Sequence, residues 1–459
     1  MKLSRRVTDL KPSATVAVMN RAKEMQRQGV DVVSFAAGEP DFDTPQPIKD
    51  AAIKALLAGQ TKYMPTMGDH ETRRIIADKV SRANGLPNVT PEHIGISAGG
   101  KHALYTVMQC LFDLPSWPML MSSPREQTVQ SVSSFVSGMD LEQVSKLRSQ
   151  MGHLRSVFLG PEEEQLECLL PVPAWVSYAP LAELAGARIV EIPSTPQADF
   201  KITPEQLRRA ITPRSRVLVL CTPSNPCGTM YTESELRALA AVVAEAARKT
   251  APDLVIVVDE IYEKIAYGGI PHFSIGSVPE IAERTITLNG LSKAYSMTGW
   301  RIGYTATSGE WGLKFMQAMA TLQGQMSTNI TSFVYPAIRT ALTECEPDAR
   351  RFCEAFGRRA ALIHKRMTAM PGLVCPRPTG AFYAFPDISA HFGKKHRAAP
   401  IDSPQQFCEA LLAAKHVAAV PGEDFGGCAR NHVRFSFACS EDTINKGMDR
   451  LAEFLGELR

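Results

Sequence analysis

The sequence predicts an α/β fold, in which a mainly parallel sheet carries helices on both faces and a smaller α+β domain is attached. Two patterns between residues 200 and 290 carry this prediction. Short, wholly apolar runs are typical of strands that are buried on both faces of a parallel sheet. Each run alternates with an amphipathic, helix-like stretch, which is the order of a βαβ unit with a right-handed crossover.

The clearest βαβ unit lies in the middle of the chain. The apolar run Val217–Leu220 predicts one strand, and a helix is expected from about Glu233 to Arg248. Thr232 and Glu235 have the spacing of a capping box, which fixes the start of that helix. The run Leu254–Val258 predicts the next strand, which we expect to lie parallel to the first.

Polar groups follow four predicted strands at the point where each strand ends. The strands are Ile94–Ser97, Val217–Leu220, Leu254–Val258 and Thr285–Asn289. The groups that follow them are Gly99-Gly100-Lys101, Asn225, Asp259 and Lys293, in that order. Because ligands of open α/β sheets bind beyond the carboxyl ends of the strands, the sequence predicts one site that contains all four groups.

Lys293 lies in the most informative stretch of the chain, between Gly290 and Gly303. A lysine that attacks a carbonyl carbon must first lose its proton, and burial or nearby positive charge makes that possible by lowering its pKa. The small residues around Lys293 leave room for a ring, and Arg301 offers a fork of donors to a phosphate. This stretch resembles the pyridoxal-phosphate attachment site of class I and II aminotransferases.

The chemical needs of pyridoxal phosphate match other residues of the chain. Its phosphate needs backbone N–H groups at a helix start and a cation, which Gly99-Gly100, Ser292 and Arg301 can supply. Its pyridine nitrogen needs a carboxylate, and its ring oxygen needs donors. Asp259 suits the first role, Asn225 and Tyr262 suit the second, and Trp175 can cover the ring face. Taken singly, each of these four also suits a structural role, as a turn, cap or core residue.

The resemblance extends over nearly the whole chain. It is similar to fold type I aminotransferases of the subgroup that contains bacterial aspartate and prephenate aminotransferases. The stretches that carry the resemblance are Leu10–Thr15, Ala37–Pro45, Thr61–Tyr63, Trp175–Tyr178, Ser224–Pro226, Asp259–Glu263 and Gly380–Tyr383. The resemblance implies a seven-stranded-type sheet, pyridoxal phosphate as cofactor, and a ping-pong reaction between an amino acid and a 2-oxo acid.

The resemblance also implies a role for each site residue. Lys293 is the Schiff-base lysine and proton carrier, and Arg434 clamps the substrate α-carboxylate beside Gly38. Lys101 meets the distal carboxylate of aspartate or glutamate, although its structural alternative is a solvated lysine at a helix start. Tyr63 reaches the phosphate of a neighbouring subunit, which implies a homodimer with shared active sites. The expected catalytic residues are Lys293, Asp259 and Tyr262. The expected cofactor contacts are Tyr63, Gly99, Gly100, Lys101, Trp175, Asn225, Asp259, Tyr262, Ser292, Lys293 and Arg301. The expected substrate contacts are Gly38, Lys101, Trp175, Asn225 and Arg434.

The predicted domains are a large cofactor-binding domain over 48–315 and a small domain formed by 1–47 and 316–459. A long helical region is expected from about Glu310 through Leu342 and beyond, with strands over Gly380–Phe385 and Val433–Phe437 and a final helix from Glu441. Residues 114–165 interrupt the strand–helix rhythm over more residues than a loop usually takes. We interpret them as a helical surface insertion, with an oligomer contact or a lid as the alternative.

Composition excludes several other classes of protein. The net charge of +3 argues against a nucleic-acid or acidic-membrane partner. The first residues lack the apolar core of a signal peptide, and the apolar runs are too short to cross a membrane. The ten cysteines are scattered without metal-ligand spacing, so we expect reduced thiols, no metal and a cytoplasmic protein.

Several alternatives stay open at this point. The stretch from Gly95 to Lys101 fits a phosphate-binding loop, but His102 stands where a magnesium-binding Ser or Thr is required. A pyridoxal-phosphate C–S lyase and a cofactor-sensing regulator without catalysis are further possibilities on the same fold. Within the aminotransferases, prephenate or an aromatic or neutral amino acid could replace aspartate. Ala174 and Cys227 depart from the tyrosine and threonine common in the family, and they put the substrate range in doubt.

Overall fold

The structure is a computed structural model that describes residues 3, 8, 14–113, 165–397 and 399–459. Its centre is a seven-stranded sheet in the order β2-β8-β7-β6-β5-β3-β4. The strands are β2 (Ile94–Ser97), β3 (Glu167–Val172), β4 (Arg188–Pro193), β5 (Ser215–Cys221), β6 (Val255–Asp259), β7 (Thr285–Gly290) and β8 (Gly303–Ala306). Only β8 runs antiparallel to its neighbours in this sheet, so the predicted mainly parallel sheet is confirmed.

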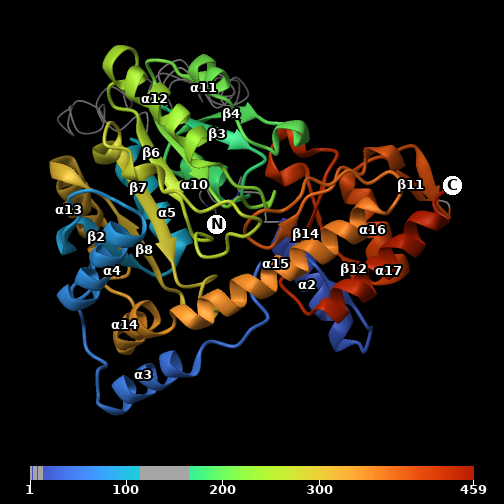
Figure 1. The fold of residues 1–459 in the computed structure, drawn as a ribbon, viewed down its shortest axis with the longest axis horizontal. Coiled ribbons are helices and arrows are strands. Elements are labelled where there is room, and N and C mark those ends of the chain that lie inside the picture. Colours follow the sequence, from blue (N-terminus) through green and yellow to red (C-terminus); the bar gives the residue numbers. More distant parts are fainter. Residues whose placement is uncertain (1–2, 4–7, 9–13, 114–164, 398) are drawn as a thin grey trace, which may run out of the picture.

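Helices cover both faces of the sheet, as the sequence predicts (Figure 1). Alternate residues of β5 show how the faces divide. Val217 and Val219 pack with α5 (Gly100–Leu111), α10 (Tyr178–Leu184) and α13 (Gly309–Met326). Leu218 and Leu220 point the other way and pack with α11 (Pro204–Ala210) and α12 (Glu233–Lys249). This two-sided burial explains why the strand reads as a continuous apolar run.

The predicted capping box starts α12. Thr232 Oγ1 accepts a hydrogen bond from the Glu235 backbone N–H at 3.3 Å, and Glu235 Oε2 accepts one from the Thr232 N–H at 2.7 Å. Both otherwise unpaired donors of the helix start are therefore satisfied.

The helical region after residue 309 is divided into three helices, where the sequence predicts one long region. After α13 come α14 (Tyr335–Glu344) and α15 (Glu346–Thr368). Thr328 takes a left-handed backbone with φ of 60°, which ends α13. Pro336 and Pro347 lie in the first turns of α14 and α15, where a missing N–H costs nothing. Together with α3 (Gln46–Leu57) and α4 (His70–Ala83), α14 packs around a core at the β2–β8 edge of the sheet.

A second group of elements forms a separate core around α15, which runs from α14 toward α16 and α17 (Figure 1). Its three-stranded antiparallel sheet has the order β13-β14-β9, and two further strand pairs flank it. The strands are β1 (Val33–Ser34), β9 (Tyr383–Ala384), β10 (Lys394–His396), β11 (Ala399–Ile401), β12 (Val417–Ala418), β13 (Val420–Pro421) and β14 (Val433–Ser436). The helices are α2 (Ala14–Arg27), α15, α16 (Pro404–Lys415) and α17 (Glu441–Glu457). The expected strand over Gly380–Phe385 is thus reduced to two residues, because Ala381 takes a left-handed φ of 54°.

Short 3-10 turns complete the described elements. They are Pro91–His93, Pro196–Ala198, Ile275–Ser277, Ala282–Arg284, Thr298–Trp300, Ser332–Val334, Ser389–His391, Glu423–Phe425 and Gly427–Ala429. In the part of the chain that the structure describes, none of the helices combines the length and the apolarity that crossing a membrane requires. The expected insertion over 114–165, with its helical stripe over 140–158, lies almost wholly outside the described residues.

Candidate active site

A cavity of about 570 Å³ opens at the carboxyl ends of the parallel strands, between the large sheet and the group of elements around α15. This volume suits a small molecule together with a cofactor. Of the predicted site residues, the structure brings together in its wall Gly38, Gly100, Lys101, Trp175, Asn225, Asp259, Tyr262, Ser292, Lys293, Arg301 and Arg434. Gly99 and Tyr63 do not line it.

Lys293 follows β7 and enters the middle of the cavity. Its Nζ donates a hydrogen bond to the Gly38 carbonyl oxygen at 2.5 Å. Burial lowers the pKa of Lys293 to about 8, with the positive charges of Arg434 and Arg301 adding to the effect and Glu39 and Asp259 opposing it. A substantial fraction of the amine is therefore neutral near physiological pH, as a nucleophile or proton acceptor requires.

Asp259 ends β6 and presents its carboxylate to the cavity. Oδ2 accepts a hydrogen bond from the Tyr178 hydroxyl at 2.7 Å, and Oδ1 accepts one from the Ile261 backbone N–H at 3.1 Å. Burial raises the pKa of Asp259 above its usual value, although the Tyr178 and Ile261 donors work against that rise. A buried carboxylate in a ligand cavity is stabilised by a cationic N–H, and a protonated pyridine nitrogen is such a group.

Arg434 reaches the cavity from β14. Its guanidinium is almost fully buried, at 2% exposure, and is packed against the rings of Tyr383 and Phe425. Nη1 donates to Asn225 Oδ1 at 3.1 Å, and Nη2 donates to the Ala36 carbonyl oxygen at 2.9 Å. Among the residues that the structure describes, the buried Nε has no hydrogen-bond partner, so the guanidinium keeps donors for a carboxylate ligand.

Two tyrosines form the wall behind Gly38. The Tyr262 and Tyr383 hydroxyl oxygens lie 2.7 Å apart in a hydrogen bond. A Cβ atom on Gly38 would meet the Tyr383 hydroxyl at 2.7 Å, so only glycine allows this approach. Asn225 Oδ1 accepts the hydrogen bond from Arg434, and the amide N–H groups of Asn225 are the donors that can reach a ring oxygen.

The start of α5 and the side chain of Arg301 form the far end of the cavity. Gly99 has φ of 86°, and a Cβ atom there would meet Arg301 Nη2 at 2.3 Å. Gly99 thus allows the guanidinium to lie against the helix start, where Gly100 faces the cavity. Backbone N–H groups and a guanidinium at one place suit a phosphate.

Lys101 lies beside this end of the cavity, with its Nζ 5.0 Å from the centre of the Trp175 ring. Burial and, to a smaller extent, the charge of Arg301 lower the pKa of Lys101. The ring of Trp175 in turn packs edge-to-face on Tyr178, with ring centres 5.3 Å apart. Trp175 therefore links Lys101 to Tyr178, which donates the hydrogen bond to Asp259.

Tyr63 is 87% exposed, and its predicted role needs a second subunit. That role stays a prediction. Sequence reasoning missed Tyr178, Tyr383 and the Glu39 carboxylate, which accepts a hydrogen bond from Thr298 Oγ1 at 2.9 Å. The sequence offered two signals for these residues. Tyr178 lies three residues after Trp175, and Glu39 lies beside Gly38.

The charges of the cavity fit the predicted cofactor. Its wall contains four basic side chains (Lys101, Lys293, Arg301 and Arg434) and two acidic ones (Glu39 and Asp259). The four basic side chains would offset the negative charges of a phosphate and two carboxylates, and the Arg434 Nε would gain a partner. The donor set therefore fits pyridoxal phosphate together with a dicarboxylic substrate.

Comparisons with known proteins agree with this geometry. The family model described as aminotransferase class I and II matches residues 30–125 and 155–451. An aspartate aminotransferase of Geobacillus stearothermophilus is 37% identical, and an aspartate/prephenate aminotransferase of Thermus thermophilus is 39% identical, each over 99% of both chains. The solved structure of the Thermus thermophilus aspartate aminotransferase with maleate superposes with a TM-score of 0.79, at 38% identity, over 99% of this chain and 100% of that one.

Proposed function

The chain belongs to the class I and II aminotransferase family, and from this premise we propose that it transfers the amino group of aspartate or glutamate to a 2-oxo acid, with pyridoxal phosphate as its cofactor. That it is an aminotransferase follows from the full-length relatives. One observation carries the choice of substrate. Two cationic side chains other than the phosphate-end Arg301, namely Arg434 and Lys101, line the same cavity as Lys293. Two such cations suit a donor with two carboxylates.

Bound pyridoxal phosphate supplies a carbonyl carbon for the amine and a protonated ring that withdraws electrons from the substrate Cα. The residues of the chain bind the substrate, orient it and move the proton. Arg434 binds the α-carboxylate and fixes the orientation of the Cα–H bond. The neutral amine of Lys293 removes the proton from Cα, and Asp259 keeps the ring nitrogen protonated through its negative charge. Tyr178 holds Asp259 in place through the 2.7 Å hydrogen bond.

Initial rates measured with aspartate and 2-oxoglutarate test this proposal. We expect parallel lines in double-reciprocal plots, because the first product must leave before the second substrate binds. Intersecting lines, or release of ammonia and pyruvate without a 2-oxo acid, would contradict it and favour a lyase.

Replacing Lys101 by alanine tests the dicarboxylic specificity. We expect kcat/KM for aspartate to fall about tenfold to a hundredfold, the effect of a lost charge-assisted hydrogen bond, and kcat/KM for alanine to change little. Equal losses for the two donors would show that Lys101 does not select the substrate.

Prephenate is the second candidate for the amino acceptor. The relative from Thermus thermophilus is named aspartate/prephenate aminotransferase, and prephenate also has two carboxylates. The rate of amino transfer from aspartate is measured with prephenate and with 2-oxoglutarate at equal concentrations. The acceptor with the higher rate is the one that the site favours.

We also propose a homodimer in the cytoplasm. Ile53, Leu56 and Leu57 share one face of α3 and are 53%, 48% and 83% exposed, and the exposed Tyr63 follows this helix. Such an apolar face suits burial against a second subunit. The ten cysteines are free thiols, as expected in a reducing compartment. Sedimentation as a monomer at micromolar concentration would contradict the dimer.

For the domains, we propose a large unit that begins near residue 48 and ends at α15, with 1–47 in the small unit. The boundary predicted from the sequence at 315/316 stays a prediction, and the packing of α13 and α14 against helices of the large sheet supports the later boundary that we propose. Phe42, by contrast, stacks on Phe352 of α15. Hydrogen exchange in which α14 opened together with α17 would contradict this division.

A further inference from the structure

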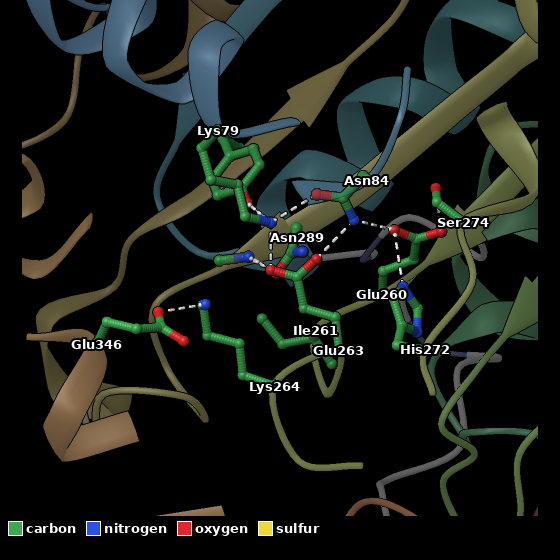
Figure 2. Close-up of polar contacts among 12 residues, drawn as sticks. Lys79, Asn84, Glu260, Ile261, Glu263, Lys264, His272, Ser274, Asn289 and Glu346 are labelled. Carbon is green, nitrogen blue, oxygen red and sulfur yellow. Dashed lines mark hydrogen bonds and ion pairs between the residues drawn. The ribbon is translucent and has the colours of Figure 1, made fainter. Parts of the chain in front are cut away.

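A buried network of polar side chains follows β6 (Figure 2), and its members do not line the active-site cavity. We call it the carboxylate network, and its members are Lys79, Asn84, Glu260, Glu263, His272 and Ser274. Lys79 lies on α4 and Asn84 directly follows that helix, whereas the two glutamates directly follow β6. The network therefore joins an outer helix to the end of a central strand.

The amide of Asn84 bridges the two glutamates. Its Nδ2 donates to Glu260 Oε2 at 3.0 Å and to Glu263 Oε2 at 2.7 Å. Asn84 Oδ1 accepts from Lys79 Nζ at 2.9 Å, and Ser274 Oγ donates to Glu260 Oε1 at 2.6 Å. Asn84 is 7% exposed and Glu260 is fully buried, so these hydrogen bonds replace water that the carboxylates have lost.

The charges of the network are balanced internally. Lys79 Nζ also pairs with Glu263 Oε1, and His272 Nε2 lies 3.4 Å from Glu260 Oε2. Burial alone would raise the pKa of Glu263, but the charges of Lys79 and His272 and the hydrogen bonds of Lys79 and Asn84 lower it to about 2. Burial opposes the charged form of His272, yet Glu260 and Glu263 raise its pKa above the usual value. The two carboxylates thus lie beside Lys79 and His272, and the donors Lys79, Asn84 and Ser274 occupy the carboxylate oxygens that a metal ion would need.

The side chains of the segment after β6 face two sides. Asp259 and Tyr262 line the cavity, whereas Glu260 and Glu263 belong to the network. The negative charge of Glu260 also acts on Asp259, where it contributes to the raised pKa of that carboxyl. A shift of the glutamates would therefore change both the position and the electrostatic environment of the cavity-facing residues.

The network reaches the neighbouring strands as well. Lys79 Nζ lies 3.3 Å from the Tyr304 hydroxyl, and Tyr304 of β8 pairs with Asn289 of β7. Asn289 lines the cavity four residues before Lys293. We propose that Lys79 and Asn84 are positioning residues: through the carboxylate network they fix the Asp259–Tyr262 segment in the wall of the cavity. This inference rests on the proposed function.

The test compares two double variants of the full-length protein, each of which removes one ion pair without leaving an unpaired charge. Lys79→Met/Glu263→Gln removes the pair inside the network. Lys264→Met/Glu346→Gln is the matched control, because the Lys264–Glu346 pair, at 2.6 Å, starts at the residue next to Glu263 but lies outside the network (Figure 2). Three quantities are measured: the unfolding midpoint, the Kd of pyridoxal phosphate for the apoprotein, and the pH midpoint of the bound cofactor's visible absorbance.

We expect the network variant to bind pyridoxal phosphate about tenfold to a hundredfold more weakly and to shift the pH midpoint, as is usual when a group that supports a ligand contact is lost. The control should match the wild type. A folded network variant with the wild-type Kd and pH midpoint would overturn the inference. If that variant does not fold, Asn84→Ala is measured instead, because it changes no charge. Its Kd for pyridoxal phosphate and its pH midpoint then decide the question in the same way.

The outcome for the wild-type protein separates this inference from the proposed function. A wild-type protein that binds no pyridoxal phosphate would overturn both. A wild-type protein that binds it, with network and control variants that are alike, would overturn the positioning role alone.

Discussion

We expect Lys293→Ala to lower the turnover of the enzyme by about two to four orders of magnitude, while the protein still binds pyridoxal phosphate. The physical reason is that Lys293 Nζ, whose pKa burial lowers to about 8, is the proton acceptor that we propose at the substrate Cα. The cofactor keeps its other contacts, because Asp259, Asn225 and Arg301 line the cavity independently of this amine. Single-turnover kinetics with aspartate measure the loss directly.

A matched control for this experiment is Lys314→Ala, which removes an exposed lysine of α13. It should leave turnover within twofold of the wild type, the range expected for a surface substitution. Near-normal turnover of Lys293→Ala, measured beside this control, would rule out the mechanism.

Arg434→Leu is expected to have the second largest effect. Removing one partner of a buried charge pair costs about 2–5 kcal/mol, which corresponds to a loss in kcat/KM of about thirtyfold to several thousandfold. Arg434 also donates to Asn225 and to the Ala36 carbonyl oxygen, so its loss leaves two buried acceptors unpaired. We expect the loss with every amino acid, because all of them present an α-carboxylate.

Two further variants serve as controls for the Arg434→Leu prediction. Arg248→Leu removes an exposed arginine at the end of α12, which does not line the cavity, and should change kcat/KM little. Arg434→Lys keeps the charge but not the fork of donors, and it should restore only a small part of the loss. If Arg434→Leu affected only dicarboxylic donors, Arg434 would bind the distal carboxylate instead.

Much of the fold was predictable because the central strands are buried on both faces. A strand such as β6 needs apolar residues at every position, and that pattern is visible without any structure. The polar groups near the strand ends were predictable for a related reason, because Asp259 comes directly after an apolar run and Lys293 follows the predicted strand Thr285–Asn289. The fold then brings them to one cavity.

Other features depend on contacts that the sequence does not display. The bond between Tyr178 and Asp259 joins residues 81 positions apart, and the closeness of Tyr178 to Trp175 in the sequence does not reveal which carboxylate it contacts. The same holds for Asn84, which resembles an ordinary residue at a helix end until both glutamates are seen beside it. The two-residue strand β9 is too short for any periodicity, so its bounds could only come from the structure.

The absorbance spectrum of the purified protein, before and after addition of aspartate alone, tests the central claim most directly. The account predicts that the visible absorbance of bound pyridoxal phosphate is replaced by that of pyridoxamine phosphate, and that 2-oxoglutarate reverses the change. Reversal would establish both half-reactions and a dicarboxylic donor. A spectrum with bound cofactor that does not respond to aspartate would contradict the proposed substrate, and a protein that binds no pyridoxal phosphate would contradict the account as a whole.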